Sequence, residues 1–115
     1  MPPAMQDQLT RLLTLGNRTI ACRAILAPMA GLTHIAFREV LGGFGGFGLA
    51  CTEMCSARAV ICGHREQTGY FRWAEGEQDS LICQIMGSEP EDMARAAEVI
   101  EDRGLFGVDI NMGCA

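Results

Sequence analysis

All nine cationic residues of the chain are arginine, so the chain contains no lysine. No lysine of these 115 residues can therefore act as a general base or a phosphate ligand. The chain also lacks an apolar run of the roughly 20 residues that a membrane-spanning helix needs. No basic segment leads into an apolar stretch at the N-terminus, so a secretion signal is not indicated. A formal net charge of −5 argues against a large nucleic-acid footprint within this segment alone.

Cysteine is present, but not in the spacing of a metal site. The six cysteines stand at positions 22, 51, 55, 62, 83 and 114, mostly within apolar runs. Reduced, buried thiols of a cytoplasmic protein fit this distribution better than disulfides. A zinc set of Cys51, Cys55, Cys62 and His64 is the alternative, but its spacing is not that of a zinc knuckle. We therefore expect no metal site and a cytoplasmic protein.

The chain divides into a leader, residues 1–21, and an alternating segment, residues 22–115. We expect the leader to be loosely docked, with a short helix over residues 6–15. Helices are expected at 34–41, with Thr33 as N-cap and Gly42–Gly48 as breaker, and from a capping box at Ser88–Glu91 to about residue 103. Four short apolar runs predict buried strands, at residues 24–27, 49–52, 81–86 and 107–110. Between them we expect a short helix or turn at 56–62 and a loop or exposed hairpin at 64–79.

This order of elements predicts an α/β fold with parallel strands joined by crossovers. Chemically useful residues follow or end the strands, namely Pro28 and Met29, Glu53, Gln84, and the segment 111–114. In a (β/α)8 TIM barrel the carboxyl ends of the strands hold the active site. Such a barrel needs about 250 residues, so four strands would be its first half, and we expect a truncated chain. A doubly wound sheet also fits the pattern.

Four motifs, taken together, carry a family resemblance. In chain order they are Ala27-Pro28-Met29-Ala30-Gly31-Leu32-Thr33, Thr52-Glu53-Met54 with Ser56-Ala57, Gln84-Ile85-Met86-Gly87-Ser88 with Pro90, and Asp109-Ile110-Asn111-Met112-Gly113-Cys114. Their order and spacing closely resemble the amino-terminal half of the tRNA-dihydrouridine synthases, over roughly residues 18–114. Four linked motifs are far more specific than any one of them.

The resemblance implies a TIM barrel that binds FMN, followed by a helical RNA-binding domain. The implied reaction is reduction of the C5–C6 double bond of a uridine in tRNA, with NADPH as the reductant of the flavin. By the same resemblance, Pro28, Met29 and Ala30 line the flavin, and Gln84 forms a hydrogen bond with the edge of its ring. The alternative for Gln84, from its place in an apolar strand, is a purely structural hydrogen bond in the core.

The resemblance further places Asn111 beside the uracil and the flavin, and makes Cys114 the proton donor to C5. A protonated thiol on the face opposite the hydride donor is suited to that step. Glu53 has two interpretations: it caps the strand end or pairs with an arginine such as Arg58, or it belongs to the site. Asp109 is expected to form hydrogen bonds with the backbone at the rim.

The chain departs from the family pattern at two positions, with Ala115 where proline is usual and His34 where aspartate is common. The remaining flavin and phosphate contacts and the RNA-binding domain would lie beyond residue 115. We therefore expect these residues alone to be inactive, to bind FMN poorly, and to associate with themselves or a partner through exposed strand edges. The alternatives are another FMN-dependent barrel reductase of a small unsaturated substrate, or a non-catalytic truncated remnant.

Overall fold

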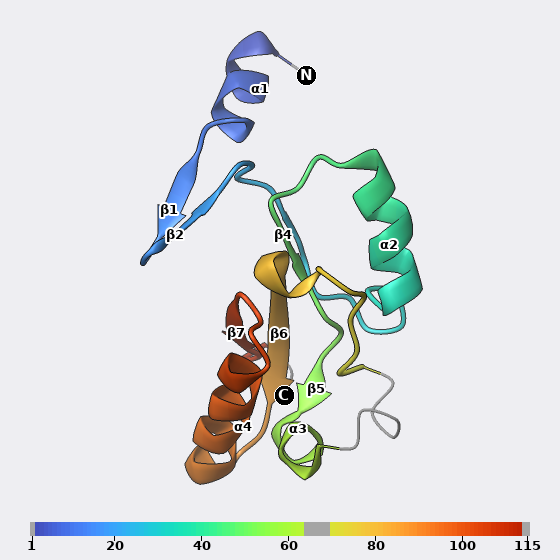
Figure 1. The fold of residues 1–115 in the computed structure, drawn as a ribbon, viewed down its shortest axis with the longest axis vertical. Helices are drawn as coiled ribbons and strands as arrows, with labels where there is room; N and C mark the ends of the chain where they lie inside the picture. Colours follow the sequence, from blue (N-terminus) through green and yellow to red (C-terminus); the bar gives the residue numbers. More distant parts are fainter. Residues whose placement is uncertain (1, 64–69, 114–115) are drawn as a thin grey trace.

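The computed structural model describes residues 2–63 and 70–113. Its centre is a parallel sheet in which β4 and β5 both pair with β6, β3 pairs with β4, and β7 pairs with β6 on the other side (Figure 1). The strands are β3 (Ile25–Leu26), β4 (Leu49–Cys51), β5 (Cys55–Ser56), β6 (Leu81–Met86) and β7 (Gly107–Ile110). The predicted parallel α/β fold is therefore confirmed.

The strands β4 and β5 occupy one position in the sheet. Ala50 of β4 lies beside Leu81, at the start of β6, and Cys55 of β5 lies beside Ile85, near its end. Counting them together, neighbouring positions in the sheet follow the order of the chain. A doubly wound sheet reverses its strand order at a switch point, whereas a TIM barrel keeps the order of the chain. The observed order is that of four successive barrel strands.

In the part of the chain that the structure describes, three helices and one short 3-10 helix connect the strands: α2 (Ile35–Phe44), α3 (Ala57–Cys62), η1 (Gln78–Ser80) and α4 (Pro90–Asp102). The helices α3 and α4 pack side by side (Figure 1). Ala96 and Ile100 lie one turn apart on α4 and are fully buried, in one cluster with Leu81, Cys83 and Ile85 of β6. No helix within the described ranges is long and apolar enough to cross a membrane.

The helix expected over residues 6–15 is wrong in its bounds. The observed helix α1 covers Pro3–Leu9, and β1 (Leu13–Leu15) and β2 (Arg18–Ile20) form an antiparallel hairpin beyond it. The register pairs Leu15 with Arg18, so the loop contains only Gly16 and Asn17. Gly16 has a φ of 61°, which favours glycine and suits a tight two-residue turn. The boundary at residue 21 stays a prediction.

The predicted helix caps are also wrong. The helix α2 begins after His34, whose Nδ1 accepts a hydrogen bond from the Phe37 N–H at 3.2 Å, and it continues to Phe44. Before α4, the Ser88 hydroxyl bonds to the Glu89 carboxylate, and no side chain caps the helix. In both cases the side chain that was expected to cap the helix forms its hydrogen bond with another nearby group, which the sequence motif does not reveal. In the loop expected at 64–79, residues 64–69 lie outside the described residues, and Phe71 is buried.

Gly48, just before β4, marks a close crossing of two chain segments. Its N–H donates to the Ala24 carbonyl at 2.9 Å. A Cβ atom on Gly48 would lie 2.1 Å from the Cys22 carbonyl oxygen, which is closer than real Cβ contacts. The chain that leaves the hairpin therefore passes directly over the start of β4, and only glycine fits between them.

Candidate functional site

The polar residues predicted for a site lie where the parallel strands end. Pro28 and Met29 follow β3, Glu53 follows β4, Gln84 lies within β6, and Asn111 follows β7. The carboxyl ends of parallel strands meet at one edge, so the sheet brings these residues to the same side. Glu53 is 4% exposed and Gln84 is 8% exposed. Because buried polar groups need hydrogen-bond partners, those partners define the arrangement.

A chain of three side chains links β6 to the end of β7. The Gln84 Nε2 donates to Asp109 Oδ2 at 2.6 Å, and the Asn111 Nδ2 donates to Gln84 Oε1 at 3.4 Å. The register places Gln84 beside Asp109, and the Asn111 N–H donates to the Ile85 carbonyl. The backbone therefore holds both amides and the carboxylate in place. Asp109 contacts a side chain here, not the rim backbone that we expected.

Thr52 lies in the short segment of chain between β4 and β5. Its hydroxyl accepts a hydrogen bond from the Gln84 N–H at 3.2 Å and donates to the Glu53 carbonyl at 2.7 Å. The side chain thus supplies an acceptor where the ladder between β4 and β6 is interrupted. Thr52 is fully buried, so this hydroxyl has no water to replace its partners. We did not predict this role from the sequence, although a hydroxyl at the end of an apolar run was a usable signal.

The segment Met29–Thr33 forms a closed turn after β3. The Met29 N–H donates to the Thr33 hydroxyl at 3.0 Å, and that hydroxyl donates to the Met29 carbonyl at 3.2 Å. The Leu32 and Thr33 N–H groups donate to the same carbonyl, each at 3.0 Å. Thr33, which we predicted as the cap of a helix, closes the turn instead. Ala30 is exposed at its tip, and Met29 is half-buried.

Glu53 fixes the turn from the neighbouring strand. Its Oε1 accepts a hydrogen bond from the Gly31 N–H at 2.5 Å. The alternative in which Glu53 pairs with Arg58 is wrong, because Arg58 pairs with Asp92 of α4 at 2.8 Å. A carboxylate that accepts from a backbone N–H forms a charge-assisted bond, which is stronger than a neutral one. Glu53 therefore belongs to the same edge as the turn.

Arg38 of α2 is a buried cation that we did not predict from the sequence. It is 3% exposed and forms a salt bridge with Glu77, with Nε 2.5 Å from Oε1. Its Nη1 donates to the Thr33 carbonyl at 2.6 Å, and its Nη2 donates to the Arg72 carbonyl at 2.8 Å. Arg38 is the buried residue of this helix, whereas Val40 is 63% exposed. The partner of Arg38, Glu77, lies 39 residues away in the sequence, so the local pattern of the helix did not indicate the ion pair.

Three buried thiols lie in the strands beneath this edge. Burial raises the pKa of Cys51 to about 11, and the charge of Asp109 adds to the rise. The pKa of Cys83 is raised by a hydrogen bond shared with Cys55 and by burial, and the same bond lowers the pKa of Cys55. Cys51 and Cys83 are therefore protonated at neutral pH. The five cysteines of the described residues are free, but Cys62 is exposed and Cys22 half-buried, against the expectation of buried thiols.

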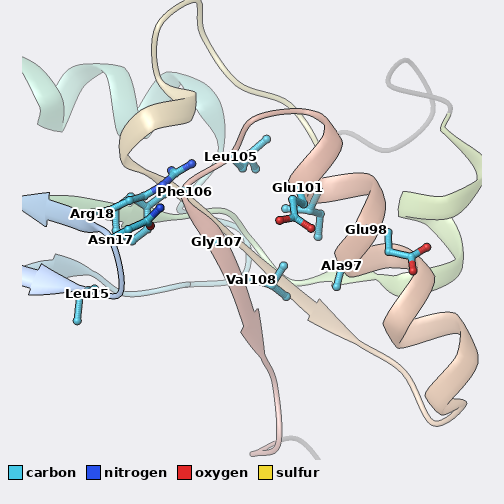
Figure 2. A pocket seen from close by; sticks show the side chains of 11 residues that line it. Leu15, Asn17, Arg18, Ala97, Glu98, Glu101, Leu105, Phe106, Gly107 and Val108 are labelled. Atoms are coloured by element: carbon cyan, nitrogen blue, oxygen red, sulfur yellow. The ribbon is translucent and has the colours of Figure 1, made fainter.

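A hollow of about 490 Å³ lies at the opposite end of the sheet (Figure 2). It is bordered by the β1–β2 hairpin, by Glu98 and Glu101 of α4, and by Phe106 before β7. The Arg18 guanidinium lies 5.2 Å from the centre of the Phe106 ring. The charged side chains around the hollow are exposed to solvent. It thus has volume but no buried polar groups that converge on a ligand, unlike the carboxyl edge.

The structure brings together most of the residues predicted for the site. Gln84 and Asn111 are in contact, and the turn that follows Pro28 and contains Met29 and Ala30 is bonded to Glu53, at the end of the next strand. Cys114 lies outside the described residues. The arrangement offers amide donors and acceptors on one side and a fixed backbone turn on the other. Such a set is able to hold a flat, polar ring system.

Parallel strands in chain order, with polar residues at their carboxyl ends, define the class of protein: these are four successive strands of a (β/α)8 barrel. Residues 25–115 match the family "Dihydrouridine synthase (Dus)". The chain belongs to this family.

Relatives with similar sequences carry names of the same kind. The chain is 42% identical over 100 residues to tRNA-dihydrouridine synthase B of Xanthomonas campestris pv. campestris, covering 87% of this chain and 30% of that protein. It is 35% identical over 103 residues to a probable tRNA-dihydrouridine synthase of Rickettsia bellii, covering 90% of this chain and 31% of that protein. The chain therefore spans about a third of the length of these relatives. No solved structure matches it.

Proposed function

We propose that the whole protein to which this chain belongs reduces a uridine of tRNA to 5,6-dihydrouridine, with FMN as cofactor and NADPH as reductant. Membership of the dihydrouridine synthase family supports the reaction. The observation that carries the proposal is the pair of bonded amides, Gln84 and Asn111, at the same edge of the sheet as the Met29–Thr33 turn. Both the flavin ring and the uracil are flat and alternate donors with acceptors, as carboxamides do.

The residues at this edge fit the flavin. A carboxamide has two N–H donors and two acceptor lone pairs, and the bonds of Gln84 to Asp109 and Asn111 engage one of each. Gln84 therefore keeps capacity for a ring edge. Pro28, Met29 and Ala30 would contact the ring through the backbone of a turn that its own hydrogen bonds hold in place. When bound, the reduced flavin supplies the hydride that adds to C6 of the uracil.

The chain's own residues would orient the base and move the proton. Asn111 would hold the uracil through its carboxamide, with its position fixed by the bond to Gln84. Cys114 would donate its thiol proton to C5 while the hydride adds to C6, so that the C5–C6 double bond becomes single. A protonated thiol is a suitable acid for this step. The uridine must leave its stack to reach the site.

The proposed partners follow from the substrate. With a formal net charge of −5 and no lysine, this segment would contribute little to the contacts with tRNA phosphates, so most of them would come from other parts of the protein. We place the protein in the cytoplasm because its proposed substrate is tRNA.

We further propose that these residues alone associate, with a second copy or with another partner. Within the described residues, β3 pairs with β4 alone and β7 with β6 alone, so each has an edge that another strand can extend. Light scattering after gel filtration tests this association, and a monomer at every concentration would contradict it. A visible spectrum of the same sample, titrated with FMN, tests the expectation that the isolated chain binds the cofactor poorly.

The reaction is best tested in a chimaera in which residues 22–115 replace the matching segment of a full-length relative. The chimaera is expressed in cells that lack the relative, and dihydrouridine in tRNA is measured by mass spectrometry. We expect the wild-type chimaera to form dihydrouridine. We expect Cys114→Ala to retain FMN and to lose at least about 100-fold in rate, the size of a general-acid contribution.

The control is Cys62→Ala, which removes an exposed thiol of α3 and should leave the rate unchanged. Full activity in Cys114→Ala would remove this thiol from the mechanism. A wild-type chimaera that binds FMN but forms no dihydrouridine would contradict the proposed reaction. Gln84→Ala should weaken FMN binding, and an unchanged affinity would make Gln84 a residue of the core only.

A further inference from the structure

The Met29–Thr33 turn is held from outside by two charged side chains. Glu53 accepts a hydrogen bond from the Gly31 N–H, and Arg38 donates to the Thr33 carbonyl at 2.6 Å. The first bond comes from the end of β4 and the second from α2, so the turn is fixed from two separate elements. Both side chains are at least 95% buried, with 4% and 3% of their surface exposed. Charge-assisted bonds in such places are short and directional.

Arg38 connects the turn to a distant part of the chain. Its guanidinium also bonds to both carboxylate oxygens of Glu77, at 2.5 and 3.0 Å, and to the Arg72 carbonyl. Glu77 in turn accepts from the Ala74 N–H at 2.9 Å. One planar group therefore meets acceptors from the turn and from residues 72–77. A lysine ammonium is a single point charge and cannot reproduce this set of bonds.

A buried ion pair is a poor way to stabilise a fold. Taking both charges out of water costs as much as their attraction returns, and apolar residues of similar volume often stabilise as well or better. What the Arg38–Glu77 pair adds is a fixed direction for the Thr33 carbonyl and therefore a fixed backbone for the turn. Binding a rigid ligand to a preorganised backbone avoids the entropic cost of ordering that backbone.

We propose that Arg38, Glu77 and Glu53 are positioning residues, which hold the Met29–Thr33 turn in the conformation that receives the flavin ring. The inference rests on the proposed function, because it assumes that this turn contacts FMN. It extends that function to three residues whose proposed action is on the turn and not on the cofactor itself. It also makes residues 72–77 part of the support of the flavin site, since Glu77 acts on the turn through Arg38.

The first test is amide hydrogen exchange on the full-length chimaera. Arg38→Met and Arg38→Lys should each speed exchange at Gly31, Leu32 and Thr33 by about tenfold or more relative to the amides of β6, since a bond to a charged donor is lost. The control is Arg58→Met, which breaks the exposed Arg58–Asp92 pair and should leave the turn unchanged. Unchanged exchange at the turn, or an equal rise throughout β6, would overturn the inference.

The second test is FMN affinity in the chimaera, followed by quenching of flavin fluorescence. We expect Arg38→Lys to raise the Kd about tenfold and Arg58→Met to leave it within twofold. Faster exchange at the turn with an unchanged Kd would overturn the positioning role and leave the proposed function intact. A wild-type chimaera that does not bind FMN would overturn the proposed function, and the flavin role of the turn with it.

Discussion

The two ends of the sheet differ in the burial and hydrogen bonding of their polar groups. At the carboxyl end, Gln84, Asp109 and Thr52 are wholly or partly buried and bond to each other or to the backbone. At the amino end, the hollow beside the hairpin is bordered by exposed charges, and Arg18 lies over the ring of Phe106. The first end has a dense set of hydrogen bonds between buried or half-buried groups. The second has volume and few such bonds.

This difference shows which observation identifies a site. Burying a polar group costs free energy unless the group forms hydrogen bonds. A cluster of buried polar groups is therefore kept only where its hydrogen bonds are satisfied or where its arrangement serves a function. A hollow lined by exposed residues costs nothing to maintain. In this chain the bonded cluster, not the hollow, coincides with the residues that the family resemblance selects.

The largest expected effect concerns Asp109. In Asp109→Ala the buried Gln84 N–H loses its acceptor, so the free energy of unfolding should fall by about 2 kcal/mol. Asp109→Asn keeps an oxygen acceptor and should cost about half as much. Urea unfolding followed by circular dichroism measures both. The matched change at the amino end, Glu101→Ala, should stay within about 0.5 kcal/mol, as expected for an exposed residue.

Equal losses in Asp109→Ala and Glu101→Ala would remove the contrast between the two ends. An Asp109→Asn variant as unstable as Asp109→Ala would mean that the charge, not the hydrogen bond, is what Gln84 requires.

The next effect depends on pH and on Cys51. Its pKa is raised from 9.0 to about 11 in the folded state, so between these values the unfolded chain loses a proton that the folded chain keeps. The contribution of Cys51 to the free energy of unfolding should therefore be constant below about pH 8. It should fall between pH 9 and 11, by at most about 1.4 kcal/mol per pH unit. By pH 10 the loss should reach about 1 kcal/mol.

Urea unfolding at pH 8, 9 and 10 measures this fall. Cys51→Ala should make the fall less steep, with a remainder from the Cys55–Cys83 pair, whereas Cys62→Ala, which removes an exposed thiol, should leave it unchanged. Asp109→Asn should reduce the fall, because the charge of Asp109 contributes to the raised pKa. A curve that is equally steep in Cys51→Ala would assign the fall to another group.

The smallest effect lies at the amino end. Arg18→Ala removes the cation from the Phe106 ring and should lower the free energy of unfolding by about 0.5 kcal/mol, the usual value for an exposed pair. A double-mutant cycle with Phe106→Leu isolates this contribution. A coupling above about 2 kcal/mol would show that the hairpin is held as firmly as the carboxyl edge.

Much of the sheet could be predicted from the sequence. The strand over Leu81–Met86 and the strand over Gly107–Ile110 have the bounds expected from their apolar runs, and α4 ends one residue before the expected position. These elements are defined by local patterns, which a single sequence contains. The order of parallel strands also followed from the alternation of strands and helices, and the family resemblance pointed to a barrel and not to a doubly wound sheet.

The features missed from the sequence depend on two kinds of partner. Some are residues far away in the sequence, and others are nearby groups between which a local sequence pattern does not decide. Arg38 meets Glu77, which is 39 residues away, so its burial could not be deduced from the pattern of α2. Thr33 had two local uses, a helix cap or a turn closure, and the second prevailed because its hydroxyl reaches both the N–H and the carbonyl of Met29. The hairpin at Gly16 and Asn17 was a local signal that could have been used. The prediction for Cys114 falls outside the described residues.

The crossing at Gly48 has a consequence for how much sequence change this connection tolerates. A library that samples all residues at position 48 should return glycine alone, because any Cβ meets the Cys22 carbonyl at 2.1 Å. Gly42, in the last turns of α2, has no atom within 4 Å of the point that a Cβ would occupy, and alanine there should be accepted and raise stability by roughly 0.5–1 kcal/mol. Two glycines six residues apart thus stand at opposite extremes of substitutability.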